Sequence, residues 1–273
     1  MKSFFLMLGF FTRLPVPKVE FTEARYREAM KLVPLVGLVV GAILAGISLL
    51  LFLVQAPTLI RGAALTCVYI FLTGGLHFDG LADTCDGVFS GRTREQSLEI
   101  MKDSRIGVFG TLGIVMAALV YFAAMAEAPF AALLVFPLCG RACCLVSASA
   151  APYARQEGMG KAAMPGGGIL NAWFAYAFIV GAAFLAIPLM MLVRLFAGRL
   201  EIPAAVFHEG SYAFAPVVPL IASGAAILVT AFMTVRFRKK LGGVTGDTFG
   251  AVIEVSSLAF LLVFIVLYRA VPL

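Results

Sequence analysis

Long, uninterrupted apolar runs alternate along the chain with short polar segments. A helix of roughly 20 mostly apolar residues crosses a hydrocarbon core of about 30 Å. Seven runs meet this requirement: residues 32–54, 59–76, 106–125, 130–151, 169–192, 215–235 and 248–267. Their hydrophobicity is continuous rather than alternating, which favours helices over the strands of a membrane barrel. The pattern therefore predicts an all-α, polytopic membrane helix bundle with about seven transmembrane helices.

The composition supports the same class. Of the 273 residues, 62% are hydrophobic and 13% are charged, whereas soluble domains are about half apolar and a quarter charged. No linker or low-complexity stretch divides the chain, so residues 1–273 are expected to form a single integral membrane domain. Two N-terminal segments, residues 3–13 and 21–31, are expected to lie along the cytoplasmic membrane face as interfacial helices.

The distribution of lysine and arginine predicts the orientation. The N-terminal side of the membrane would hold 17 of the 21 basic residues, and the other side would hold Arg61, Arg194, Arg199 and Arg269. Because cytoplasmic loops are enriched in basic residues, we expect a cytoplasmic N-terminus and a location in the cytoplasmic (inner) membrane. Topology and anionic lipid explain most of the net charge of +6, which therefore does not indicate nucleic acid binding.

One acidic motif stands out in a chain with so few charges. Asp79, Asp83 and Asp86 are spaced i, i+4 and i+7, within roughly a 60° arc of one helix face. Carboxylates that crowd together raise one another's pKa or share a cation, and Mg²⁺ is commonly held by a few carboxylates plus substrate phosphates. The ordinary alternative is a solvated acidic face. Apolar flanks and a position at the membrane boundary favour a functional site.

A second acidic pair, Asp247 and Glu254, follows a glycine-rich segment. The two residues are i, i+7 and share a helix face. One interpretation is a helix N-terminus that helps to bind phosphate or metal. Another is that Gly246 and Gly250 simply allow close helix packing. The two are compatible, and packing alone does not explain a glutamate two turns into a membrane helix.

Basic groups on the same side would complete an anion site. The candidates are Arg13, Lys102, Arg105 and Arg141. Arg141 falls inside a predicted span, where an unpaired arginine is costly, so a ligand is favoured for it. Topology explains the charge of Arg13 equally well.

His77 precedes the first aspartate of the motif by two residues, so it would face roughly the opposite side of a continuous helix. Gly74 and Gly75 would break that helix and let His77 turn inward. A histidine is well matched to general base catalysis at neutral pH, although a capping or interfacial role is an equal alternative. Cys85, inside the motif, is expected to be a spacer rather than a nucleophile.

The chain resembles the cobalamin synthase family, also called adenosylcobinamide-GDP ribazoletransferase. The resemblance spans nearly the whole chain in the same order, through residues 10–17, 74–87, 100–110, 152–160 and 242–251. The block Gly-Gly-Leu-His-Phe-Asp-Gly-Leu-Ala-Asp-Thr at residues 74–84 is long and specific. The one departure in the segment 74–87 is Cys85, directly after this block, where the family more often has alanine, and this supports the spacer interpretation.

The resemblance implies an integral membrane enzyme that performs the last assembly step of adenosylcobalamin synthesis. Such an enzyme joins adenosylcobinamide-GDP to α-ribazole or its 5′-phosphate, with Mg²⁺, and releases GMP. We then expect Asp79, Asp83, Asp86 and Asp247 to hold Mg²⁺ against the diphosphate. The phosphates would be contacted by Arg13, Lys102, Arg105, Arg141 and Arg155, and His77 or Asp103 would serve as the base. A homo-oligomer is left open.

Two other classes remain as alternatives. A secondary transporter or proton-coupled channel would use acidic residues near the bilayer midplane, often in paired repeats. Here the main cluster lies at one face, and no repeat is evident. A phospholipid-forming phosphotransferase would instead release CMP from a CDP-lipid, as CDP-alcohol phosphotransferases do with aspartates embedded in the membrane.

Overall fold

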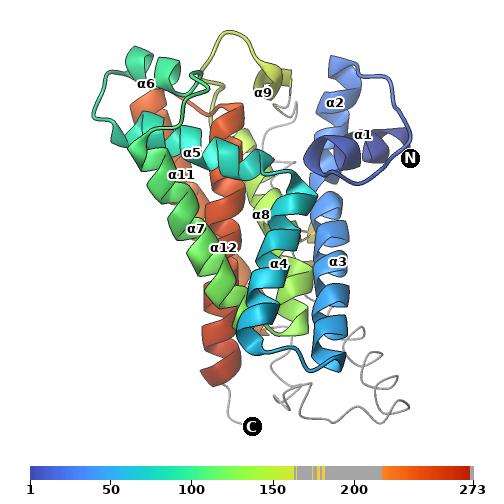
Figure 1. Cartoon of the computed structure of the whole chain (residues 1–273). Coiled ribbons are helices and arrows are strands. Elements are labelled where there is room, and N and C mark those ends of the chain that lie inside the picture. Colours follow the sequence, from blue (N-terminus) through green and yellow to red (C-terminus); the bar gives the residue numbers. More distant parts are fainter. Residues whose placement is uncertain (163, 165–173, 175–176, 179, 182–216, 271–273) are drawn as a thin grey trace.

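The computed structural model describes residues 1–162, 164, 174, 177–178, 180–181 and 217–270 (Figure 1). In these ranges the regular elements are helices, apart from a single bridge between Tyr153 and Val244. The predicted all-α class is confirmed. The long helices are α3 (Val33–Leu53), α7 (Val108–Glu127), α8 (Phe130–Ala150), α11 (Val217–Leu241) and α12 (Gly246–Ala270). The shorter elements are α1 (Lys2–Phe11), α2 (Glu23–Ala29), η1 (Met30–Leu32), α4 (Thr58–Thr73), α5 (Leu76–Phe89), α6 (Arg94–Ile100) and α9 (Met159–Ala162).

Five helices of the described residues are long and apolar enough to cross a membrane, or up to six if the bent pair α4–α5 forms one span. In this set α2, η1 and α3 follow one another as a single stretch, Glu23–Leu53. Six of the seven predicted runs therefore coincide with helices. The predicted run 169–192 lies almost wholly outside the described residues, so the count of seven stays a prediction.

Helix α8 forms the buried centre of the bundle, and α3 packs closely against it. At Gly37 and Gly41 of α3, an added methyl group would collide with backbone atoms of Pro137 and Leu134 in α8. Small residues allow this kind of approach between membrane helices, where van der Waals contact replaces the hydrophobic effect as the main attraction. The close packing of α3 on α8 therefore depends on residues without a side chain.

A sharp break separates α4 from α5. Gly74 and Gly75 both adopt left-handed backbone angles, with φ of 61° and 71°, which glycine reaches without the penalty of a Cβ. The two helices meet at 88°, so α5 lies across the end of the bundle outside the membrane-crossing helices (Figure 1). The predicted run ended at Leu76, but α4 ends at Thr73 because the glycine pair turns the chain there.

One end of the bundle carries α1, α2, α5, α6 and α9, and we call it the α5 end (Figure 1). The α3–α4 and α7–α8 connections lie at the opposite end. The segments predicted to be cytoplasmic meet at the α5 end. The side of the membrane that this end faces stays a prediction.

Candidate active site at the α5 end

Two glycines bring the acidic motif against the start of α12. A Cβ on Gly80 would lie 2.7 Å from the Asp247 carbonyl oxygen and 3.1 Å from its Cα. A Cβ on Gly250 would lie 3.0 Å from the His77 carbonyl oxygen and 3.2 Å from the Gly80 Cα. Helices α5 and α12 thus cross backbone to backbone, which confirms the close-packing interpretation for Gly250. The phosphate or metal interpretation of the glycine-rich segment stays a prediction. Gly246 packs less tightly, since its nearest neighbour would be 3.9 Å away.

This crossing places three carboxylates in one electrostatic neighbourhood. Asp79 is exposed and Asp83 is half-buried, both on α5. Burial and the negative charges of Asp247 and Asp79 raise the pKa of Asp83 to about 7. The Asp83 carboxylate is therefore destabilised while it lacks a proton or a cation. The expected crowding is present among Asp79, Asp83 and Asp247, and Asp86 adds a smaller repulsion on Asp83.

Asp86 is engaged elsewhere. Its carboxylate is buried and accepts hydrogen bonds from the backbone N–H groups of Gly107, at 2.7 Å, and Gly110, at 2.9 Å. These are the first amides of α7, which lack partners within their own helix and favour a negative charge. Both carboxylate oxygens of Asp86 are thus occupied in fixing α7 to α5.

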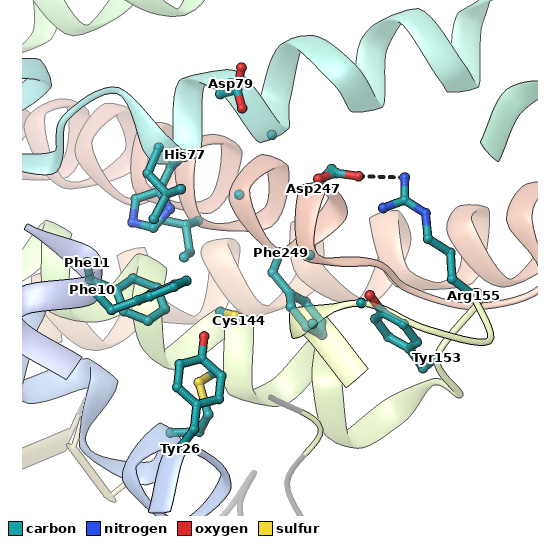
Figure 2. Close-up of a pocket in the computed structure, with 18 residues that line it drawn as sticks. Phe10, Phe11, Tyr26, His77, Asp79, Cys144, Tyr153, Arg155, Asp247 and Phe249 are labelled. Atoms are coloured by element: carbon teal, nitrogen blue, oxygen red, sulfur yellow. Dashed lines mark hydrogen bonds and ion pairs between the residues drawn. The ribbon is translucent and has the colours of Figure 1, made fainter. Parts of the chain in front are cut away.

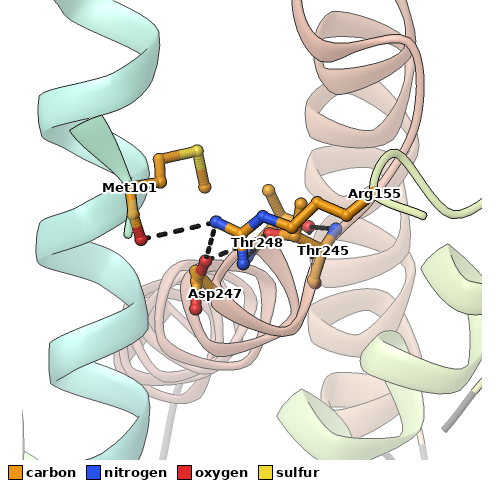
Figure 3. A network of polar contacts seen from close by, with 5 residues as sticks. All are labelled: Met101, Arg155, Thr245, Asp247 and Thr248. Atoms are coloured by element: carbon orange, nitrogen blue, oxygen red, sulfur yellow. Dashed lines mark hydrogen bonds and ion pairs between the residues drawn. The ribbon is translucent and has the colours of Figure 1, made fainter. Parts of the chain in front are cut away.

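Arg155 forms an ion pair with Asp247, with 2.8 Å between Nη2 and Oδ2 (Figures 2 and 3). Its Nη2 also lies 3.4 Å from the Met101 carbonyl oxygen, and its buried Nε has no hydrogen-bond partner among the described residues. Thr245 caps α12, because its hydroxyl accepts from the Thr248 N–H at 3.2 Å and the Thr248 hydroxyl accepts from the Thr245 N–H at 2.7 Å. Two residues predicted separately, Arg155 and Asp247, are therefore brought together.

The loop after α6 carries the other polar candidates. Asp103 and Arg105 pair with each other at the surface, with 2.6 Å between Oδ2 and Nη2. This pairing lowers the pKa of Asp103 to about 2. Lys102 lines an open groove of about 650 Å³, which Arg155 also lines. Neither Asp103 nor Arg105 lines the cavity at the α5–α12 crossing.

His77 and Arg141 contact each other beneath the site. Arg141 is fully buried, donates to the Pro137 carbonyl oxygen at 3.1 Å, and has its Nη2 3.4 Å from His77 Nε2. Burial and the positive charge of Arg141 lower the pKa of His77. The break at Gly74 and Gly75 turns His77 inward, as expected. Arg13 lies at the same break. Its side chain covers Gly74, and its backbone N–H donates to the Leu72 carbonyl oxygen at 2.7 Å.

Glu254 belongs to a buried polar network that its sequence position did not predict. Its carboxylate accepts hydrogen bonds from the Tyr121 hydroxyl at 2.6 Å and the Tyr69 hydroxyl at 3.1 Å. The positive charge of Arg141 acts on it from the neighbouring helix. The tyrosines supply the hydrogen bonds that a buried carboxylate requires. Cys85 packs on Gly113, and burial beside Asp86 raises its pKa to about 11, so it is a thiol at neutral pH.

A cavity of about 280 Å³ opens at the crossing. Asp79, His77, Arg155 and Asp247 line its polar part (Figure 2). Its apolar part is lined mainly by Phe10, Phe11, Tyr26, Met30, Cys144 and Phe249. The N-terminal helices α1 and α2 therefore form a wall of the cavity, in addition to any contact with the membrane face. This wall could not be predicted from the sequence, because an apolar aromatic segment beside a membrane also fits an interfacial anchor.

Comparisons with known proteins agree with the motifs. The family model described as cobalamin-5-phosphate synthase matches residues 3–265. A relative from Acetivibrio thermocellus, named adenosylcobinamide-GDP ribazoletransferase, is 38% identical, with 97% of each chain covered. Relatives of the same name from Alkaliphilus oremlandii and Escherichia coli are 36% and 33% identical over 96% of this chain, covering 96% and 98% of their own lengths. No solved structure matches the chain.

Proposed function

Because the chain belongs to the cobalamin-5-phosphate synthase family, we propose that it joins adenosylcobinamide-GDP to α-ribazole or its 5′-phosphate. The product is adenosylcobalamin or its 5′-phosphate, and the second product is GMP. The observation that carries this proposal is the meeting of Asp79, Asp83 and Asp247 with Arg155 beside the cavity at the α5–α12 crossing. A diphosphate needs charge neutralisation of this kind where its bridge is broken.

The reaction is a displacement at phosphorus. A ribose hydroxyl of α-ribazole forms an oxygen–phosphorus bond to the phosphorus that carries cobinamide. The bond from that phosphorus to the bridging oxygen breaks, and GMP leaves with the bridging oxygen and its electron pair. The hydroxyl proton passes to a base. The protein contributes mainly by holding the hydroxyl and the phosphorus in line.

The carboxylates at the crossing fit Mg²⁺ as the cofactor. The described residues contain no group of three or more His, Cys, Asp or Glu side chains already arranged as a metal site. Mg²⁺ is usually held by one or two carboxylates together with substrate phosphates, so a complete protein ligand set is not required. Asp79, Asp83 and Asp247 would hold the ion, which would relieve the raised proton affinity of Asp83 and Asp247. When bound, it would neutralise charge on the diphosphate.

Arg155 is the best-supported phosphate contact, because it lines both the cavity and the neighbouring groove. Lys102 would contact phosphate from the groove. Arg13 would act from the α4–α5 break. Arg105 is exposed and paired, and would reach phosphate only by exchanging Asp103 for it. Arg141 supports the site from below through His77.

His77 is the better-supported base of the two candidates. It lines the cavity, and its lowered pKa keeps it neutral, as an acceptor must be. Arg141 is a donor only, so the His77 Nε2 that faces it carries no proton and Nδ1 does. The contact with Arg141 would give way as Nε2 accepts the proton. Asp103 is the weaker candidate because its carboxylate is paired with Arg105 at the surface and does not line the cavity.

We also propose that the α5 end faces the cytoplasm, with the protein in the inner membrane. The N-terminal segment, the α5–α6 segment and the α11–α12 junction lie at this end and carry most of the basic residues (Figure 1). Positive charge close to membrane helices is retained on the cytoplasmic side. Both soluble substrates would then approach the site from the cytoplasm.

Purified protein in lipid nanodiscs, supplied with adenosylcobinamide-GDP, α-ribazole and Mg²⁺, tests the proposal by release of GMP. Asp83→Asn should lower turnover by about 100-fold or more, the scale of losing transition-state charge stabilisation. Glu127→Gln is the matched control, because Glu127 lies at the other end of α7 and pairs with Arg269. Folded wild-type protein that releases no GMP refutes the function, and CMP released from a CDP-lipid supports a phospholipid phosphotransferase instead.

A further inference from the structure

The cavity at the α5–α12 crossing has two chemically different ends. Asp79, Asp247 and Arg155 lie toward one end, and aromatic side chains from two distant parts of the chain lie toward the other (Figure 2). Phe10 comes from α1 and Phe249 from α12. The proposed function requires one substrate of this two-part character, a flat aromatic base joined to a ribose.

The size of the cavity limits what it holds. Its volume of about 280 Å³ is at the lower end of ligand pockets, which span about 300–1,000 Å³. A bicyclic base with its sugar is of this size, whereas the corrin macrocycle of the other substrate is far larger. The candidates for the aromatic end are therefore the base of α-ribazole and the guanine of adenosylcobinamide-GDP.

Hydrogen bonding separates these two bases. Guanine presents two donor groups and a carbonyl acceptor along one edge, and burying them without partners costs free energy. The aromatic end is lined by Phe10, Phe11, Met30 and Phe249. Its polar groups are the Tyr26 hydroxyl and His77, which lies on Phe11, and these are fewer than the two donors and one acceptor of that edge require. The base of α-ribazole has an apolar benzene edge and one free ring nitrogen. The Tyr26 hydroxyl points into this end and can donate to such a nitrogen (Figure 2).

One backbone position in the lining suits a sugar. At Gly246 an added Cβ would have its nearest neighbour 3.9 Å away, so the backbone there is open to the cavity and a ribose can lie directly against it. A ribose placed there connects an aromatic base at one end to carboxylates and an arginine at the other.

We propose that this cavity is the α-ribazole site, with the base between Phe10 and Phe249 and the ribose hydroxyls toward Asp79 and Arg155. The assignment rests on the proposed function. It leaves the neighbouring open groove for the nucleotide half of adenosylcobinamide-GDP. That groove is lined by three basic and three acidic side chains, those of Arg94, Lys102, Arg155, Glu95, Glu99 and Glu157. The phosphorus would then be attacked where the cavity and the groove meet, at Arg155.

Equilibrium binding of α-ribazole to the purified protein, without Mg²⁺ or adenosylcobinamide-GDP, tests the site. Phe249→Ala and Phe10→Ala should each weaken binding about 5- to 150-fold, the range that alanine substitution gives for a base-stacking aromatic. Phe71→Ala is the matched control, because Phe71 is 76% exposed on α4 and does not line the cavity. It should bind α-ribazole as the wild type does.

A competition experiment on the wild type does not depend on the folding of any variant. Benzimidazole should displace α-ribazole, and guanosine should not. Displacement by guanosine alone, unchanged affinity in folded Phe249→Ala, or no binding of α-ribazole to the wild type would each overturn the site. Binding of α-ribazole with no release of GMP in the complete assay would refute the proposed function and leave the site standing.

Discussion

Gly80→Ala perturbs the contact on which the candidate site depends. The new Cβ would lie 2.7 Å from the Asp247 carbonyl oxygen, where carbon and its neighbours prefer about 3.5–4 Å. Helices α5 and α12 would therefore separate locally by about 1 Å. Overpacking of this kind costs about 1–3 kcal/mol, and alanine returns about 1 kcal/mol through its higher helix propensity. The net loss of stability is then about 0–2 kcal/mol.

The effect on turnover should be much larger. A displacement of about 1 Å between groups that must act together costs about 100-fold in rate, or about 2.7 kcal/mol in the barrier. Gly80→Ala should thus lower GMP release about 100-fold while the protein remains folded, because Asp83 and Asp247 no longer lie together. Thermal unfolding in detergent and steady-state turnover measure the two effects on the same preparation.

Gly46→Ala is the control for this variant. Gly46 also lies within a helix, α3, and a Cβ there would meet no atom within 4 Å. Its turnover should equal that of the wild type, with equal or slightly higher stability. Turnover of Gly80→Ala within about threefold of the wild type would refute the claim that this crossing positions the carboxylates.

Three further predictions concern stability. Gly41→Ala should lower the free energy of unfolding by about 1–3 kcal/mol, because the methyl group would collide with a backbone carbonyl of α8. Any gain in helix propensity, which Gly46→Ala measures by itself, would offset part of this loss. Asp86→Ala should lose about 1–3 kcal/mol, because two amides of α7 are left without an acceptor, and amide exchange at the start of α7 should rise. Without divalent cations, stability should fall as the pH rises from about 4 to about 7, because the raised pKa of Asp83 means that the folded state holds a proton the unfolded state releases. Bound Mg²⁺ should reduce this loss of stability, so the rise in Tm that Mg²⁺ causes should be larger at about pH 7 than at about pH 4. A rise in Tm that is the same across this pH range would contradict the prediction.

Much of the fold could be predicted because membrane solvation leaves a simple pattern. A continuous apolar run must satisfy its backbone internally, so helices at residues 33–53 and 130–150 follow from composition alone. The break at Gly74 and Gly75 was also visible, since paired glycines favour left-handed backbone angles. The angle of 88° between α4 and α5 could not be predicted from the sequence, because the direction of α5 depends on its packing against α12 and α7.

The site was harder to predict than the fold. Helical spacing correctly put Asp79, Asp83 and Asp86 on one helix, but spacing does not say which neighbour each residue meets. Asp86 meets the amides of α7, and Asp247 joins the other two through a glycine contact between residues far apart in the sequence. The aromatic wall that α1 and α2 contribute to the cavity could not be predicted from the sequence for a related reason. Apolar residues at a membrane boundary look the same whether they face lipid or a cavity.

The division of labour within the motif explains why one short helix can build the site. Asp86 ties α5 to the first amides of α7, and that helix begins directly after the loop that holds Lys102 and Arg105. Asp79 and Asp83 stay available on the same helix, held against α12 by Gly80. A movement of α5 would therefore shift the carboxylates and the basic loop together. In the proposed reaction a diphosphate would contact both, so their relative position would matter more to turnover than the position of either within the bundle.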